Sequence, residues 1–289
     1  MNKHTTKMIK KIILALALLN GTQVLLNAQS KEDSLAIVKA NWQIEKSHPG
    51  IVQKSASISN LFGGPQSVHI LELDPKQGIN AEIAYSDTLI LTSKLARDHG
   101  AIAAINGSYF AAEGNSVSFF KVHKEAIDST IPKIYRRCNG LVYTHKGKLQ
   151  LLPWSKAIED RWNVNKGIML ASGPSLMENG KYSEWLDPED LKFFPKKHPR
   201  SALAFTKDGT ILAIAVDGRA PGNAIGMSIP EFAFLTKILG CERALNLDGG
   251  GSTTLWIDGK ILNHPTDNKR FDHEGERKVA NIIYFYYKK

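Results

Sequence analysis

The chain has 289 residues, of which 43% are hydrophobic and 22% are charged, and its formal net charge is +9. This composition belongs to a globular protein that can bury a sizeable core. The positive charge is spread along the chain without a long run of like charges or a basic helix with interleaved aromatic residues, which argues against nucleic acid as a partner. Two cysteines, Cys138 and Cys241, do not make a disulfide framework, and we expect both to be buried thiols.

The first residues have the pattern of a secretory signal peptide. Four lysines precede an apolar run from Ile12 to Leu26, and a small residue suited to cleavage follows at Ala28. The run is short and is interrupted by polar residues at 20–23, so it does not suit a stable membrane span. We therefore expect a signal peptide at 1–28 and an exported, periplasmic or secreted mature chain without a membrane span. An uncleaved anchor is the alternative.

An N-terminal helical arm is predicted at 29–50 and a single catalytic domain at 51–289. Ser30 to Trp42 has a capping hydroxyl, early acids and apolar spacing suited to a short helix. Residues 55–65 are small and polar and are predicted to form a loop. Strands are predicted at Val68–Leu73 and Ile79–Ala84, and no linker interrupts the chain from there to Tyr287.

Several tight turns and two helices follow. Glycine stands after Lys146, Asn179, Asp208 and Asp258, each time beside strand-like residues, which favours antiparallel hairpins. One helix is predicted over 228–240, with a capping box at its start and Gly240 as its left-handed stop. A second is predicted over 93–99. The pattern indicates an α+β fold: a mixed, largely antiparallel β-sheet core with a few packed helices.

Three short apolar strands end in the same way. The strands end at Asn106-Gly, Asp217-Gly-Arg219 and Asp248-Gly, and small unbroken apolar strands are typical of positions buried on both faces. If the strands are neighbours in one sheet, these polar side chains meet at one edge of the core. An ordinary turn is the alternative for each of the three.

The turn after Asp248 differs from an ordinary hairpin turn, because three glycines are followed by Ser252, Thr253 and Thr254. Main-chain amides without side chains can form an anion site, and neighbouring hydroxyls add donors. The spacing excludes the usual phosphate loop and the dinucleotide fingerprint, because a strand and not a helix follows. Asp248 would repel phosphate, so it must address another part of a substrate or bind a cation.

At this point the sequence resembles the phosphodiester glycosidase family, which includes N-acetylglucosamine-1-phosphodiester alpha-N-acetylglucosaminidase and bacterial relatives. Motifs in the family's order span roughly residues 51–287. They are Ala104-Ile-Asn-Gly-Ser-Tyr-Phe110, Ser172-Gly-Pro-Ser-Leu-Met-Glu-Asn-Gly-Lys181, His198-Pro-Arg-Ser-Ala202, Val216-Asp-Gly-Arg219, Asn246-Leu-Asp-Gly-Gly-Gly-Ser-Thr-Thr254 and Arg277-Lys-Val-Ala-Asn281. Ser201 stands where threonine is usual.

The resemblance implies hydrolysis of the bond between a sugar anomeric carbon and a phosphodiester oxygen, with a sugar-phosphate or glycan as substrate. Asp248 is the first choice for the catalytic carboxylate and Asp217 the second. Arg200 or Arg219 would bind the phosphate oxygens. The remaining candidates would assist at the phosphate or orient sugar hydroxyls or an acetamido group: Gly249, Gly250, Gly251, Ser252 and Thr253 for the phosphate, and Asn106 and Asn281 for the sugar.

No cofactor is expected, and the histidine spacing suggests no metal site. A calcium ion at Asp248 stays open as an alternative. Two other functions also stay open: a non-catalytic binding or assembly protein for exported polysaccharide, and a metal-dependent phosphodiesterase that cuts the P–O bond.

Overall fold

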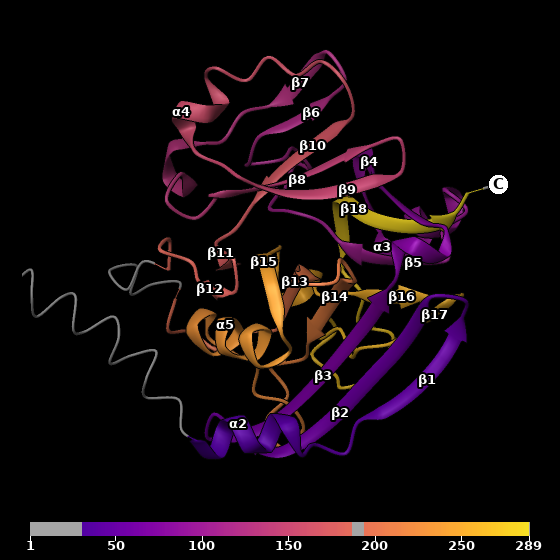
Figure 1. The fold of residues 1–289 in the computed structure, drawn as a ribbon, viewed down its shortest axis with the longest axis vertical. Helices are drawn as coiled ribbons and strands as arrows, with labels where there is room; N and C mark the ends of the chain where they lie inside the picture. Colours follow the sequence, from indigo (N-terminus) through magenta and orange to yellow (C-terminus); the bar gives the residue numbers. More distant parts are fainter. Residues whose placement is uncertain (1–30, 187–193, 289) are drawn as a thin grey trace, which may run out of the picture.

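The structure is a computed structural model that describes residues 31–186 and 194–288. The predicted signal peptide at 1–28 therefore lies outside the described residues. Three antiparallel sheets and a few helices make up the described part of the chain (Figure 1). This confirms the predicted α+β class with a largely antiparallel core. No helix in the described ranges is both long and apolar enough to cross a membrane.

The largest sheet has eight strands in the order β1-β2-β3-β14-β13-β15-β11-β12. Its strands are β1 (Gln43–His48), β2 (Ile51–Leu61), β3 (Gly64–Leu73), β11 (Ser175–Glu178), β12 (Lys181–Tyr182), β13 (Arg200–Thr206), β14 (Ile211–Val216) and β15 (Cys241–Asn246). The central strands are buried on both faces. Along β14, alternate residues enter two separate hydrophobic clusters, which explains the unbroken apolar sequence that predicted such a strand.

Two sheets of five strands complete the core. The second sheet has the order β7-β6-β10-β8-β9 and the third β17-β16-β5-β18-β4. Their strands are β4 (Ile79–Leu91), β5 (Ala103–Asn106), β6 (Phe120–Val122), β7 (Glu125–Asp128), β8 (Gly140–His145), β9 (Lys148–Pro153), β10 (Ile168–Ser172), β16 (Leu255–Ile257), β17 (Lys260–Ile261) and β18 (Lys278–Tyr287).

Four α helices lie in the described ranges: α2 (Lys31–Val38), α3 (Thr92–Asp98), α4 (Lys156–Glu159) and α5 (Ile229–Ile238). Short 3₁₀ turns stand at η1 (Pro75–Gln77), η2 (Pro132–Ile134) and η3 (Gly250–Ser252). Helix α5 has the predicted capping box, in which Ser228 and Glu231 satisfy each other's main-chain N–H groups. Helices α2 and α5 pack on one face of the large sheet, as Figure 1 shows.

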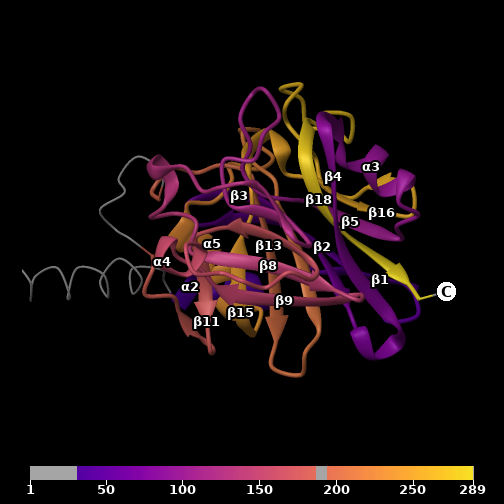
Figure 2. The ribbon, with the colours of Figure 1, turned by 90° about the horizontal axis from the view of Figure 1, so that it is seen from above.

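The central cluster lies where the three sheets face one another. It draws side chains from β3 and β14 of the first sheet, from β8 and β10 of the second, and from β5 and β18 of the third. Seen from above in Figure 2, the third sheet stands beside the first, and α3 covers its outer side. The ends of strands from different sheets are thereby brought together.

The four predicted hairpins are confirmed, at β8–β9, β11–β12, β13–β14 and β16–β17. Two other predictions were wrong. Residues 55–65, predicted as a loop, lie largely in β2, which pairs with β3. The predicted arm at 29–50 does begin with a helix, α2, but its residues 43–48 form β1, an edge strand of the large sheet. Strand β2 does alternate at its buried residues Ala56 and Ile58, whereas no residue of β1 is fully buried.

Strands β5, β14 and β15 do not all belong to one sheet, as the shared ending had suggested. Strand β5 is in the third sheet, whereas β14 and β15 lie in the first with β13 between them. Asn106 nevertheless reaches the end of β15 because the two sheets face each other. Cys138 and Cys241 are both buried free thiols, as predicted.

Candidate active site at the end of β15

Asp248 follows β15 and is held by two hydrogen bonds from the strand end of another sheet. Its main-chain N–H donates to the Gly107 carbonyl at 3.0 Å, and its carbonyl accepts from the Asn106 side-chain amide at 2.7 Å. The Asn106 side-chain oxygen, Oδ1, in turn accepts from the Ser201 hydroxyl at 2.7 Å and from the Thr254 N–H at 3.1 Å. Asn106 is completely buried, and this arrangement supports a positioning role for it.

The glycines after Asp248 are required by close contacts inside the protein. A Cβ atom on Gly249 would lie 2.6 Å from the Pro199 carbonyl oxygen, and one on Gly251 would lie 2.3 Å from an Asp267 oxygen. Gly250 has a φ of +64°, and a Cβ there would lie 2.7 Å from the Arg219 guanidinium. The backbone thus approaches its own neighbours, which the sequence could not distinguish from an approach to a ligand.

The main-chain amides of this loop correct one part of the predicted anion site. The Gly250 N–H donates to the Pro199 carbonyl at 2.9 Å, and the N–H groups of Ser252 and Thr253 donate within the η3 turn at 3.3 Å. The Gly249 N–H is directed at the Asp248 carboxyl group. These amides are occupied by the protein, so the loop does not present three amides to a phosphate. An anion at this loop would therefore have to be bound mainly by side chains.

Replacing Gly249 with Ala is expected to lower the free energy of unfolding by about 2 kcal/mol, the usual cost of forcing an extra group into a packed site. The reason is the contact with the Pro199 carbonyl, a main-chain atom that cannot rotate away. Urea unfolding measures the change. Gly209→Ala is the comparison: its surroundings are open and its cost comes only from its φ of +91°, whereas Gly249 has an ordinary φ of −122° and its cost comes only from the contact. An equal or smaller loss for Gly249→Ala than for Gly209→Ala would contradict the prediction.

The Asp248 carboxyl group lies beside a hydroxyl and a guanidinium. An Asp248 oxygen lies 3.4 Å from the Arg277 Nη2, and Arg277 also donates to the Ser252 hydroxyl oxygen at 2.5 and 3.2 Å. Burial raises the pKa of Asp248, while the Ser252 hydrogen bond and the charge of Arg277 oppose that rise. The Asp248 side chain keeps 17% of its exposure, so the carboxylate is reachable from outside.

Arg277 was absent from the predicted site residues, although it begins the last motif of the family resemblance. It precedes β18, and its guanidinium lies 5.6 Å from the centre of the Phe110 ring. Its side chain is 37% exposed, more than that of Asp248. A planar cation next to an accessible carboxylate is suited to binding an anionic group beside the reacting atom.

The two predicted arginines lie in different surroundings. Arg219 is exposed, packs over Gly250 and has a φ of +60°, an unusual conformation for a bulky residue. Arg200 is buried and donates to the Met227 and Lys196 carbonyls at 2.9 and 2.7 Å. Burial lowers the pKa of Arg200 to about 10. Arg219 is therefore the better placed of the two to meet a substrate.

His198 is a further residue near these arginines that lacked a role in the sequence-based prediction. Burial, and then the charges of Arg200 and Arg219, lower the pKa of His198. Its Nδ1 atom is buried without a hydrogen-bond partner in the structure. His198 therefore offers a neutral imidazole next to the cationic side of the site.

Asp217, the second predicted carboxylate, is completely buried in a different cluster. Its two oxygens accept from Ser67, His69, Asn263 and His264. Burial alone would raise the pKa of Asp217, but these hydrogen bonds, those of His264 and His69 above all, hold it well below its ordinary range. This placement favours Asp248 over Asp217 as the catalytic carboxylate.

The remaining predicted residues are buried around the loop. The Asn281 side-chain oxygen accepts from the Ser108 N–H at 2.8 Å, and it lies so close to Gly107 that a Cβ there would be 1.9 Å away. The Thr253 hydroxyl is buried without a hydrogen-bond partner in the structure. Asn281 and Thr253 thus lie next to the strand ends that hold Asp248, and their contacts with a substrate stay predictions.

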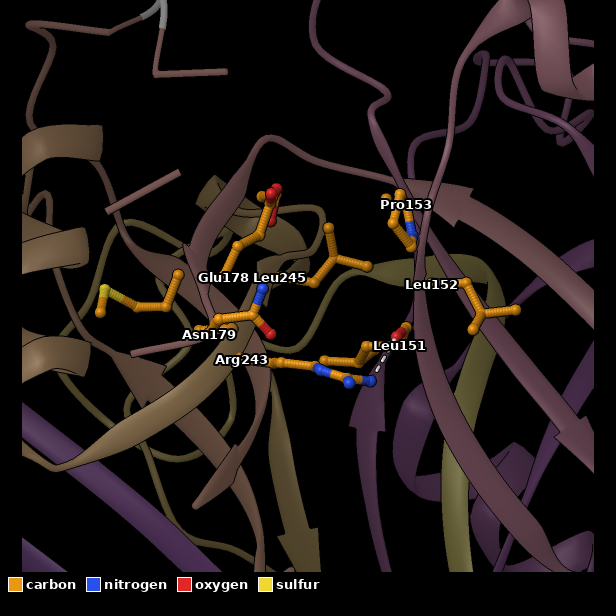
Figure 3. Close-up of a pocket in the computed structure, with 11 residues that line it drawn as sticks. Leu151, Leu152, Pro153, Glu178, Asn179, Arg243 and Leu245 are labelled. Atoms are coloured by element: carbon orange, nitrogen blue, oxygen red, sulfur yellow. Dashed lines mark hydrogen bonds between the residues drawn. The ribbon is translucent and has the colours of Figure 1, made fainter. Parts of the chain in front are cut away.

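A pocket of about 290 Å³ lies elsewhere, between β8 and β9 of the second sheet and β11 and β15 of the first. Figure 3 shows Arg243 extending toward Leu151, with Glu178 and Asn179 on one side of the pocket and Pro153 on the other. The Arg243 guanidinium donates to the Leu151 carbonyl at 3.5 Å. None of the predicted site residues lines this pocket, so its volume does not mark the candidate active site.

Comparison with known proteins places the chain in a family. The model of the phosphodiester glycosidase family matches residues 99–286. The SPbeta prophage-derived uncharacterized protein YomE of Bacillus subtilis is 39% identical over 71 residues, which cover 25% of this chain and 11% of YomE. N-acetylglucosamine-1-phosphodiester alpha-N-acetylglucosaminidase of Mus musculus is 29% identical over 77 residues, which cover 27% of this chain and 14% of the mouse protein.

Solved structures share the fold. The catalytic domain of zebrafish N-acetylglucosamine-1-phosphodiester alpha-N-acetylglucosaminidase, auto-inhibited by its pro-peptide, superposes with a TM-score of 0.63 at 19% identity, over 86% of this chain and 88% of that one. A hypothetical protein from Synechocystis superposes with a TM-score of 0.62 at 17% identity, over 86% and 64% of the two chains. At these identities the likeness concerns the fold alone.

Proposed function

The chain belongs to the phosphodiester glycosidase family, and we propose that it hydrolyses the C1–O bond of a sugar-1-phosphodiester, releasing the free sugar and a phosphomonoester. The observation that carries the proposal is the contact of Asp248 with Arg277, which also donates to Ser252, so that an accessible carboxylate lies beside a cation. We further propose that the substrate is similar to an N-acetylglucosamine-1-phosphodiester and that the protein acts after export.

The chemistry needs two different electrostatic surroundings a few ångströms apart. A departing phosphomonoester carries its negative charge without a strong general acid, so the site must hold that charge. Arg277 and Arg219 would do so, Arg277 as a planar donor pair and Arg219 from the rim of the loop. Arg200, which is buried, would add positive potential without contacting the phosphate.

Asp248 would act on the sugar side. As a carboxylate it either stabilises the oxocarbenium-like transition state or takes a proton from the attacking water as that water's oxygen bonds to C1. The C1–O bond breaks and its electron pair leaves with the phosphate. A raised pKa makes Asp248 a better proton acceptor than an exposed aspartate.

A panel of sugar-1-phosphodiesters that vary in sugar and in aglycone tests the proposal, with product analysis in oxygen-18 water. We expect the label in the released sugar. Label in the phosphate would instead support a phosphodiesterase that cuts the P–O bond. Binding without turnover across the panel would support a non-catalytic protein for exported polysaccharide.

Replacing Arg277 with Lys is expected to lower kcat/KM by about 10- to 100-fold, because lysine keeps the charge but loses the planar pair of donors. Arg277→Ala should cost more, since the cation is then absent next to the phosphate. Steady-state kinetics on the best substrate of the panel measures both changes. Arg243→Lys is the matched control in the unrelated pocket and should leave kcat/KM within about twofold. Equal activity of Arg277→Lys and the unaltered protein would remove Arg277 from phosphate binding.

A further inference from the structure

Two histidines and an aspartate converge at one point behind the glycine loop. His69 Nε2 lies 3.0 Å and His264 Nδ1 2.9 Å from the same oxygen of Asp217, Oδ2. All three atoms lie within 4.8 Å of one another. The Ser67 hydroxyl joins them, 2.7 Å from Asp217 Oδ2 and 2.9 Å from His69 Nε2. We propose that Ser67, His69, Asp217 and His264 form a binding site for a divalent transition-metal ion such as Zn²⁺.

The number of polar atoms at Asp217 Oδ2 is the first argument. Three of them contact this one oxygen, which has two lone pairs. The other oxygen, Oδ1, is already used by the Asn263 side-chain amide at 3.1 Å and the His264 N–H at 2.8 Å. With a cation between these atoms, Asp217 Oδ2 and the two imidazole nitrogens would all direct lone pairs at the cation. Three groups would then no longer have to donate hydrogen bonds to the single oxygen Oδ2.

The distances are the second argument. Two ligands about 2.1 Å from a metal lie about 3.0 Å apart in octahedral coordination and about 3.4 Å apart in the tetrahedral coordination that Zn²⁺ prefers. The separations from Asp217 Oδ2 to the two imidazole nitrogens are 3.0 and 2.9 Å, so the three atoms are already near ligand spacing and tetrahedral Zn²⁺ needs them to move apart by only about 0.5 Å. Imidazole nitrogens suit Zn²⁺ and similar ions, whereas Ca²⁺ and Mg²⁺ prefer oxygen ligands. The donor set therefore selects a transition metal.

The fold holds each ligand in place. Ser67 and His69 are two residues apart on β3 and so share a face, and Asp217 follows β14, which pairs with β3 in register. The His264 ring stacks on Phe271 at 4.0 Å and on His273 at 4.4 Å. Asn263 and the His264 N–H orient Asp217 from its other oxygen, as outer-shell groups do in metal sites.

The proposed metal site can be reached from one side, and it is linked to the main chain that follows the glycines. The Asp217 side chain is completely buried, while that of His264 is 22% exposed, so an ion and a bound water can enter from the His264 side. Asn263 also bonds the Thr253 carbonyl and the Leu255 N–H, on the main chain that follows the glycines. A metal here would brace the segment between β17 and β18, which leads to Arg277, against the large sheet.

Calorimetric titration of the EDTA-treated protein, without a polyhistidine tag, with ZnCl2 and separately with CaCl2 tests the proposal. We expect one Zn²⁺ per chain and at least about 100-fold weaker binding of Ca²⁺. His69→Gln and His264→Gln should each weaken Zn²⁺ binding by about 100-fold or more and abolish the rise in melting temperature that Zn²⁺ produces. Asp248→Asn should bind Zn²⁺ unchanged, which separates this site from the proposed active site.

His145→Gln is the matched control, since His145 is a partly buried histidine of the second sheet. Unchanged Zn²⁺ binding in both ligand variants, or Ca²⁺ binding as tight as Zn²⁺ binding, would overturn the proposal. If the ligand variants do not fold, the visible absorption of Co²⁺ bound to the unaltered protein takes their place. Bands of a site with nitrogen ligands that disappear on adding one equivalent of Zn²⁺ support the site, and the absence of such bands refutes it.

Discussion

Replacing Asp248 with Asn is expected to lower kcat/KM on a sugar-1-phosphodiester by about 10³-fold, within the range that proton transfer by a positioned carboxylate contributes. The substitution keeps the shape of the side chain and removes the charge that, in the proposed mechanism, acts on the sugar. The main-chain hydrogen bonds to Gly107 and Asn106 do not involve the carboxyl group, so the loop should keep its conformation. Steady-state kinetics with the purified variant measures the loss.

The same substitution should make the protein more stable at neutral pH. Because burial raises the pKa of Asp248, the protonated form favours folding, and the stability it contributes is present at low pH and is lost as the pH rises through the raised pKa. Asparagine resembles the protonated form at every pH. Asp248→Asn should therefore melt at a higher temperature than the unaltered protein at pH 7, with a difference that shrinks toward pH 4.

Asp258→Asn provides the control, because it makes the same charge change in the exposed β16–β17 turn, at a φ of +47° that asparagine tolerates. Its activity should stay within about twofold of the unaltered protein. Full activity of Asp248→Asn would exclude Asp248 from the mechanism, whatever its stability.

Replacing Asp217 with Asn is expected to lower the free energy of unfolding by about 3 kcal/mol, the range found when one partner of a buried charged network is lost. Both Asp217 oxygens accept hydrogen bonds, and asparagine turns one of these acceptors into a donor that faces other donors. The loss should be seen by urea unfolding in the presence of EDTA, so that it does not depend on a metal.

Asp208→Asn is the comparison for that measurement. Asp208 accepts hydrogen bonds from Thr206 and Thr210, but it lies in the exposed β13–β14 turn. It should lose less than about 0.5 kcal/mol. A similarly small loss for Asp217→Asn would show that the buried cluster around Asp217 contributes little to folding.

The fold could be predicted from the sequence where the signal is local. Turns with glycine in a left-handed conformation, the capping box of α5 and the doubly buried strand β14 each depend on a few adjacent residues. Strand β2 was missed although Ala56 and Ile58 alternate with serines, since small polar residues are also typical of loops and the strand is specified by its pairing with β3. Sheet membership of β5 likewise depends on packing between sheets.

The sequence predicted the residues at and next to Asp248, but not the contacts that surround them. Asp248 and its glycines stood out by composition, and Asn106 does lie beside them. The occupied amide of Gly250 and the metal-like cluster at Asp217 depend on contacts between segments far apart in the chain. His69 precedes Asp217 by 148 positions, so no motif spacing could have indicated the pair.

The two buried thiols have a consequence for how the protein opens. Cys241 lies in β15 of the large sheet, and Cys138 precedes β8 of the second sheet. Burial raises the pKa of Cys241 to about 12 and raises that of Cys138 as well, so neither forms the reactive thiolate while its surroundings stay closed. A thiol reagent therefore labels each cysteine only when the structure around it opens transiently. The ratio of the two labelling rates compares the local stability around β15 of the first sheet with that around β8 of the second.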